Sequence, residues 1–223
     1  MTELKACLFD LDGVIVDTAK YHYQAWQQIT KALGIPFSLA DNEKLKGVSR
    51  MDSLDIILKL GKLHICDERK LELAESKNEI YKGFISGMDS SEILPGATKL
   101  LSALRRENIK IGLGSSSKNA KTILHQVGLY SQFDTVIDGN MVNRSKPDPE
   151  VFLLGAKALQ SPPHHCVVFE DAEAGIEAAN RAGMVSIGVG SPQCLGKAKM
   201  VIPSLDTITP EVIQSLFKVN LEA

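Results

Sequence analysis

The feature that most constrains the fold of this chain is the alternation of short apolar, β-rich runs with helical patterns. The apolar runs cover Ala6–Phe9, Ile109–Leu113, Phe133–Ile137, Cys166–Phe169 and Val185–Val189. Strands that are apolar along their whole length are usually buried on both faces, as in a parallel sheet covered by helices. The segments between these runs carry apolar residues at helical spacing. The alternation therefore predicts an α/β fold with a doubly wound, mainly parallel, Rossmann-like sheet.

One stretch, residues 18–87, interrupts the alternation with successive helical patterns and no convincing strand. Apolar and polar residues share one helix face at His22, Trp26, Ile29 and Leu33, and again at Leu73, Lys77, Ile80 and Phe84. We therefore predict an α/β core of residues 1–17 and 88–223 with an inserted all-α cap of residues 18–87. The polar runs at residues 16–18 and 87–91 are the expected linkers. Ligands of open α/β sheets bind beyond the carboxyl ends of the strands, so we expect the cap to close over that edge.

Composition limits the classes of partner and location. The 223 residues are 44% hydrophobic and 23% charged, a balance that supports a folded core without disulfides. Lys plus Arg number 25 against 27 Asp plus Glu, so we expect neither nucleic acid nor a membrane as partner. The chain has no apolar run of about 18 residues and no signal-peptide pattern. Its four cysteines form no C-x-x-C pair and predict small buried thiols in the cytoplasm. We expect a cytoplasmic monomer.

Two carboxylates, Asp10 and Asp12, follow the first predicted strand in the run Phe9-Asp10-Leu11-Asp12-Gly13. Side chains two residues apart at a strand end can point to the same side. Like charges at this spacing raise each other's pKa unless a cation intervenes, and Mg²⁺ with oxygen ligands suits that role. One carboxylate could then act as a nucleophile and the other as an acid/base. The run also fits a solvated Asp-Gly turn, although the following Val14–Val16 is unusually apolar for one.

Two further polar clusters follow later predicted strands. Ser115–Asn119 precedes a helix, where backbone N–H groups, hydroxyls and the Lys118 ammonium can bind an anion. The same segment also fits an ordinary helix N-cap. Ser145–Pro149 would place Lys146 at the same edge of the sheet, and it equally fits a helix start with proline in the first turn.

A fourth cluster, Glu170 and Asp171, could complete a metal site begun by Asp10, or it could simply begin a helix favourably as acidic residues do. The cap adds polar side chains that could line a closing cleft: Lys46–Arg50, Ser53, Lys77 and His22. A lysine on an apolar stripe can instead extend its ammonium to solvent, and a histidine there can simply pack. Arginine is suited to bidentate phosphate binding.

In order and spacing, these motifs resemble the four motifs of the haloacid dehalogenase superfamily of phosphotransferases. The matching runs are F-D-L-D-G-V-I-V-D-T, S-S-S-K-N, S-K-P-D-P and F-E-D-A-E-A-G-I, within about residues 4–190. The helical insert resembles the small α-helical cap of that superfamily. Within it, the cap is most similar to that of the β-phosphoglucomutase family, in L-K-G-V-S-R with Ser53, in H-Y-Q-A-W and in S-K-N at residues 76–78.

The resemblance implies a Mg²⁺-dependent enzyme that acts on a sugar phosphate. It would interconvert β-glucose 1-phosphate and glucose 6-phosphate through an aspartyl phosphate and a bisphosphate intermediate. A sugar-phosphate phosphatase on the same scaffold is the alternative, since it needs only water in place of the sugar hydroxyl. A phospho-aspartate receiver or a catalytically silent binding module is a third possibility, and a receiver has no reason to carry a helical cap with Arg50, His22 and Lys77.

The resemblance also implies residue roles. Asp10 would be the nucleophile and Asp12 the general acid/base. The metal ligands would be Asp10, the Asp12 backbone carbonyl, Glu170 and Asp171. The phosphate-binding residues would be Ser115, Ser116 and Lys146 for the transferring group, and Arg50, Ser117, Lys118 and Asn119 for the other. The sugar-binding residues would be His22, Trp26, Gly47, Val48, Ser49, Ser53, Lys77 and Asn78. Ser116 stands where such mutases commonly have alanine, and Asp52 where they often have glutamate.

Overall fold

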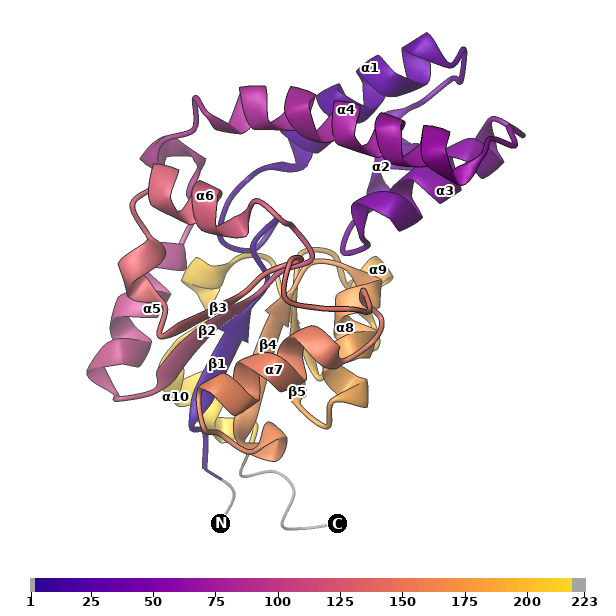
Figure 1. Ribbon diagram of the computed structural model, residues 1–223. Coiled ribbons are helices and arrows are strands. Elements are labelled where there is room, and N and C mark those ends of the chain that lie inside the picture. Colours follow the sequence, from indigo (N-terminus) through magenta and orange to yellow (C-terminus); the bar gives the residue numbers. More distant parts are fainter. Residues whose placement is uncertain (1–2, 218–223) are drawn as a thin grey trace.

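The computed structural model describes residues 3–217 as a sheet with helices on both faces and a helical layer above one edge of that sheet (Figure 1). The strands are β1 (Ala6–Phe9), β2 (Lys110–Gly114), β3 (Thr135–Ile137), β4 (Cys166–Glu170), β5 (Val185–Val189) and β6 (Met200–Ile202). Their order is β3-β2-β1-β4-β5-β6, and every neighbouring pair is parallel. The predicted doubly wound sheet is confirmed. The sequence pattern did not predict β6, whose three residues are too few to show a period.

The two faces of the sheet are buried by different helices, because successive strand residues point to opposite sides. Cys7 and Phe9 of β1 face one cluster, and Ala6 and Leu8 face the other. The first cluster includes residues of α5 (Ala97–Arg106), α6 (Ala120–Gln126) and α10 (Pro210–Ser215). The second includes residues of α7 (Glu150–Ala158) and α8 (Glu173–Arg181). The short elements are α9 (Pro192–Leu195), η1 (Ser90–Glu92), η2 (Tyr130–Gln132), η3 (Pro163–His165) and η4 (Leu205–Thr207).

The helical layer consists of α1 (Ala19–Ala32), α2 (Leu39–Glu43), α3 (Arg50–Leu60) and α4 (Asp67–Ile85). These helices bury a hydrophobic cluster of their own around Trp26, Leu54 and Ile57. Tyr81 and Ile85, in the last turns of α4, belong instead to the first core cluster, which contains Cys7 and Phe9 of the sheet. The separate cluster supports a cap distinct from the core, while the boundaries at residues 17/18 and 87/88 stay a prediction.

The first connection between core and cap differs from the polar linker expected at residues 16–18. Val16 and Thr18 are fully buried, and only Asp17 is exposed. The Asp17 N–H donates to the Glu92 carbonyl at 2.9 Å, and the Leu94 N–H donates to the Ile15 carbonyl at 2.9 Å. The two segments that connect cap and core are thus hydrogen-bonded to each other. The prediction of a polar, exposed linker at residues 16–18 is therefore wrong.

The four cysteines form no disulfide in the structure, and their burial is mixed. Cys7 and Cys166 are buried in the sheet, whereas Cys66 and Cys194 are exposed, so the prediction of buried thiols is wrong for the second pair. Across residues 3–217, none of the helices is both long and apolar enough to cross a membrane.

Two helical glycines differ sharply in their surroundings, and we expect opposite effects from alanine. A Cβ at Gly175 in α8 would lie 1.9 Å from Oε1 of Glu170, whose side chain is fully buried. A Cβ at Gly83 in α4 would meet no atom within 4 Å. Gly175→Ala should therefore reduce the free energy of unfolding by about 1–3 kcal/mol through overpacking. Gly83→Ala should increase it by about 0.5–1 kcal/mol through helix propensity.

Urea unfolding followed by circular dichroism would measure both changes. Equal effects at the two positions would contradict the proposed crowding around Glu170.

Candidate active site

The first motif forms a tight turn directly after the central strand β1. The Asp10 N–H donates to the Phe169 carbonyl of β4 at 2.9 Å, which fixes Asp10 at the carboxyl edge of the sheet. Gly13 has a φ of +83°, a conformation that glycine adopts without steric cost. Its N–H donates to the Val16 carbonyl at 2.9 Å and closes the turn. Asp10 and Asp12 are thereby held at the end of the strand.

The Lys146 ammonium lies between two buried carboxylates. Its Nζ donates to Asp10 Oδ1 at 2.5 Å and to Glu170 Oε1 at 2.6 Å. Burial alone would lower the pKa of Lys146, but the two carboxylates raise it above its ordinary value. Burial, with a contribution from Glu170, raises the pKa of Asp10 despite the neighbouring ammonium. Glu170 Oε2 also accepts the Ala172 N–H at 2.8 Å, so each oxygen of this carboxylate accepts a hydrogen bond.

The Asp12 carboxylate is contacted by groups from the start of the cap. The Thr18 hydroxyl donates to its Oδ1, and His22 Nε2 lies 3.7 Å from the same atom. Burial would raise the pKa of Asp12, but His22 and Thr18 lower it below its usual value. Lys77 Nζ lies 3.0 Å from His22 Nδ1 and is also above the ring of Tyr81. Burial, followed by the charge of Lys77, lowers the pKa of His22.

Asp171 brings a third carboxylate to the turn of the first motif. A Cβ on Gly13 would lie 2.2 Å from Asp171 Oδ2, so only glycine lets this carboxylate approach the turn so closely. Burial and the adjacent Glu170 raise the pKa of Asp171 to about 7, partly offset by Lys46. Such closely placed oxygen ligands have an excess of negative charge, which a hard divalent cation would neutralise.

The carboxylates expected to bind metal do not form one cluster of side chains. Within residues 3–217, no three His, Cys, Asp or Glu side chains are grouped as metal ligands usually are. Glu170 is directed to Lys146, and the Asp12 carboxylate to Thr18. The side chains that fit an oxygen-ligated cation are Asp10 and Asp171, and the metal assignment stays a prediction.

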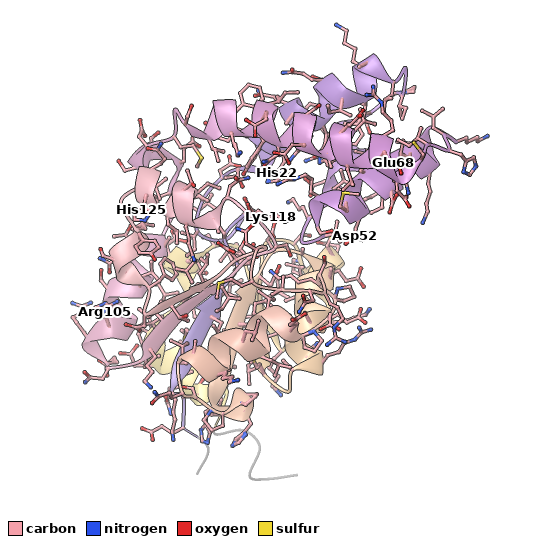
Figure 2. All side chains as sticks on the ribbon, viewed as in Figure 1. His22, Asp52, Glu68, Arg105, Lys118 and His125 are labelled. Carbon is pink, nitrogen blue, oxygen red and sulfur yellow. The ribbon has the colours of Figure 1, made fainter. Side chains whose placement is uncertain are left out.

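A cavity of about 910 Å³ lies between the cap and the carboxyl edge of the sheet. Most of the predicted site residues line it: Asp10, Asp12, His22, Trp26, Gly47, Val48, Ser49, Arg50, Ser53, Lys77, Asn78, Ser116, Ser117, Lys118, Asn119, Lys146 and Asp171. Ser115 and Glu170 are fully buried behind it. Figure 2 shows His22 on the cap side of this cavity and Lys118 facing it from the core.

Two of the hydrogen bonds between cap and core join residues that line the cavity from both sides. The Asn119 amide donates to Asn78 Oδ1 at 3.0 Å, and the Ser116 hydroxyl donates to the Gly47 carbonyl at 3.0 Å. The second contact gives a side-chain role to a position where the resembling mutases commonly have alanine. The Ser115 hydroxyl accepts the Ser117 N–H at 3.0 Å and so shapes the loop from behind.

Sequence reasoning missed several residues of this site. The sequence patterns assign Thr18 to a linker and give Tyr81 no role, although the Tyr81 ring packs on His22 with centroids 4.3 Å apart. They predict Lys46 only as one of the polar cap residues that could line a cleft, yet its Nζ lies 3.3 Å from Asp171 Oδ2. Tyr81 is four residues after Lys77 on the same helix, and this spacing could have identified it. Thr18 and Lys46 depend on tertiary contacts that no local pattern encodes.

Comparisons with known proteins agree with the geometry. Residues 4–183 match the family model of haloacid dehalogenase-like hydrolases. The chain is 43% identical to a β-phosphoglucomutase of Bacillus subtilis, over 94% of each chain. It is 34% identical to a fructose-1-phosphate phosphatase of Escherichia coli, over 82% of this chain and 94% of the relative. A crystal structure of β-phosphoglucomutase from Clostridium difficile superposes with a TM-score of 0.93 at 44% identity, covering 97% of this chain and 98% of that one.

The buried Lys77 predicts a pH-dependent term in stability. Burial, helped by Arg50, lowers the pKa of Lys77 to about 7, whereas an unfolded lysine titrates near its ordinary value. Between these two values the unfolded chain binds more protons than the folded one, so this term increases stability as pH rises above about 7. Below that pH the folded protein must hold a buried charged ammonium, and the cost is fully present.

We therefore expect Lys77→Met to gain stability relative to the wild type below pH 7, and this advantage should shrink between pH 7 and pH 9.5. Urea unfolding at a series of pH values would measure it. Lys82→Met, a change on the exposed part of the same helix, serves as the control and should show a flat difference. A flat profile for Lys77→Met would mean that Lys77 is charged throughout.

Proposed function

The chain belongs to the family of haloacid dehalogenase-like hydrolases, and within it we propose that this protein is a phosphotransferase that interconverts β-glucose 1-phosphate and glucose 6-phosphate. The cycle runs through an aspartyl phosphate on Asp10 and a sugar bisphosphate. The observation that carries the proposal is one cavity whose lining includes two sets of groups suited to phosphate. Asp10 and Lys146 make up one set, and Arg50 and Lys118 make up the other. The full-length similarity to β-phosphoglucomutases supports the choice of sugar.

In the phosphoryl-transfer step a carboxylate oxygen of Asp10 attacks phosphorus, and the bond from phosphorus to the sugar oxygen breaks. Charge accumulates on the oxygens of the transferring group, so catalysis depends on positioning and positive neighbours. Lys146 supplies a fixed ammonium because Asp10 and Glu170 hold it in place. In the Ser115–Ser117 loop the Ser116 N–H would provide a further donor, because the Ser115 N–H donates to the Ile137 carbonyl and the Ser117 N–H donates to the Ser115 hydroxyl.

Asp12 is the group that handles the proton of the sugar hydroxyl. Its lowered pKa keeps it ionised near neutral pH, so it can accept the proton when the hydroxyl attacks the phosphoryl group on Asp10. It returns that proton to the leaving oxygen in the other half of the cycle. The Thr18 hydroxyl and His22, backed by Lys77, hold the Asp12 carboxylate in position.

Mg²⁺ is the proposed cofactor, held by the Asp10 and Asp171 carboxylates and the Asp12 backbone carbonyl, with Glu170 behind them. When bound it would neutralise charge on the transferring phosphoryl oxygens. The oxygen-only donor set and the mutual repulsion of Asp10 and Asp171 fit a hard divalent cation.

The second phosphate of the bisphosphate would lie against Arg50, Ser117, Lys118 and Asn119. Arg50 Nη1 lies 3.3 Å from Glu75 Oε2, an exposed partner that a phosphate could replace. The side of the cavity proposed to contact the sugar, called the sugar wall, is formed by cap residues: His22, Trp26, Gly47, Val48, Ser49, Ser53, Lys77 and Asn78. Trp26 is almost wholly buried, so its part is to shape that wall.

A sugar-phosphate phosphatase is the second candidate, favoured by the 34% identical phosphatase relative. It would use the same Asp10 and Lys146 but would accept water in the second half-reaction. In the mutase, water must be a poor acceptor. This requires that Asp12 is aligned only when sugar fills the cavity and the cap is closed.

The decisive test is the product formed from β-glucose 1-phosphate with Mg²⁺ and a trace of glucose bisphosphate. We expect glucose 6-phosphate with little free phosphate, because the bound sugar hydroxyl outcompetes water for the phosphoryl group. Coupled assays for glucose 6-phosphate and for inorganic phosphate would measure both products. Asp10→Asn should abolish both while unfolding like the wild type, since no other group can replace the nucleophile. Free phosphate as the main product would establish the phosphatase instead.

Arg50→Ala should affect the sugar substrate far more than a small phosphoryl donor. Acetyl phosphate has no second phosphate and cannot use Arg50, so formation of phospho-Asp10 from it should change less than about threefold. Conversion of the hexose phosphate should fall about ten- to a hundredfold, the range expected for losing one charged hydrogen bond. Steady-state rates with acetyl phosphate and with the hexose phosphate would measure the difference between the two losses.

Arg69→Ala is the matched control, because Arg69 is an exposed arginine of the cap paired with Glu72. It should leave both rates unchanged. An equal loss with both donors in Arg50→Ala would contradict the assigned phosphate contact.

A further inference from the structure

Lys46 forms an ion pair between the cap and the core that the proposed reaction does not use. It lies between α2 and α3 of the cap, and Asp171 follows β4 of the core. Lys46 Nζ is 3.3 Å from Asp171 Oδ2 and 2.9 Å from Glu43 Oε2. The ammonium therefore sits between one nearly buried carboxylate of the core and one exposed carboxylate of the cap.

The neighbouring backbone shows that this part of the cap is docked closely on the core. Gly47 has a φ of +74°, and a Cβ there would lie 2.9 Å from the Ala172 Cβ. Its carbonyl also accepts the Ser116 hydroxyl at 3.0 Å. Residues 46 and 47 thus contact two separate core loops that follow β2 and β4. Breaking the Lys46–Asp171 pair would loosen one of these contacts directly.

Asp171 has two carboxylate oxygens, and Oδ2 is the one near Lys46. A divalent cation held by this carboxylate would repel the ammonium, because two cations at one carboxylate repel each other. Such a cation would therefore weaken the Lys46–Asp171 pair. This step rests on the proposed function, which makes Asp171 a metal ligand.

The structure also provides a place for the displaced ammonium. A second cavity, of about 330 Å³, lies beside the first and is lined by Gly13, Asp17, Glu43, Lys46 and Asp171, among others. Lys46 and Asp171 line both cavities, whereas Glu43 lines the second and not the first. A small rotation of the Lys46 side chain toward Glu43 would keep one ion pair and give up the other.

We propose that Lys46 is an internal counter-cation of Asp171 that ties the cap to the core, and that this tie and divalent-cation binding oppose each other. Metal loading then releases the cap at this point, and cap closure through Lys46 weakens metal binding by the same factor. In the metal-free protein the Lys46–Asp171 pair would reduce the repulsion among the carboxylates of the site. It would also make opening of the cap depend on the metal.

Calorimetric titration of the whole chain with MgCl₂, without phosphate or sugar, tests the competition. Lys46→Met should bind Mg²⁺ about three- to tenfold more tightly than the wild type, the range expected for a partly exposed ion pair. Glu43→Gln should bind it more weakly, because the ammonium loses its alternative partner. Lys44→Met removes the same charge two residues away, from an exposed pair with Asp41, and should change the affinity less than twofold.

Equal affinities in the wild type, Lys46→Met and Lys44→Met would overturn the proposal and leave the proposed function intact. An equal tightening in both lysine variants would also overturn it, since it would show only a general charge effect. If the wild type binds no Mg²⁺, the metal assignment of the proposed function fails, and the competition fails with it.

The tie to the cap can be measured with the two exposed cysteines, Cys66 in the cap and Cys194 in the core. Spin labels at both positions report the distance across the cavity by pulsed electron resonance, provided that the labelled protein keeps its Mg²⁺ affinity. Mg²⁺ should broaden or lengthen the distance distribution in the wild type. Lys46→Met without metal should already show the broader or longer distance distribution of the Mg²⁺-loaded wild type, and adding Mg²⁺ should not change it. A distribution insensitive to both Mg²⁺ and the substitution would refute the tie.

Discussion

The interaction on which the site depends is the buried contact of the Lys146 ammonium with the Asp10 and Glu170 carboxylates. One positive charge cannot neutralise two buried negative ones, so the centre keeps an excess of negative charge even before Asp12 and Asp171 are counted. Removing Lys146 would leave two uncompensated buried carboxylates, which is strongly destabilising. The same excess makes the centre receptive to a divalent cation and, once that is bound, to a phosphoryl group.

The parallel sheet makes this contact possible between residues far apart in the sequence. Asp10 ends β1 and Glu170 ends β4, and these two strands are adjacent. Lys146 comes from the loop that follows β3, on the other side of β1. Because every strand is parallel, all three loops leave from the same edge, and the chemistry collects at one place. Gly13 and Gly175 then permit close approach of Asp171 and Glu170, where any larger residue would collide.

Much of this arrangement could be predicted because it depends on local patterns. The five apolar runs became five strands, and the polar residues after them lie at one edge, as the parallel topology requires. What could not be predicted depends on contacts between distant segments. The burial of Thr18 follows from its hydrogen bond to Asp12, and the burial of Lys77 follows from its place against His22 and Trp26. Three-residue β6 is held by its pairing with β5, which a short sequence window does not show.

The two halves of the chemistry are supported by different parts of the fold. The groups that hold Asp10 come entirely from the core, so this proposed nucleophile is positioned whether or not the cap is closed. The groups that hold Asp12 come from the first turns of α1 and, through Lys77, from α4 of the cap. A shift of the cap would therefore disturb Asp12, the proposed acid/base, and leave Asp10 in place. Such a division would let the enzyme remain phosphorylated while it awaits a sugar. Water could enter the open cavity, but the carboxylate that must activate it would not be aligned.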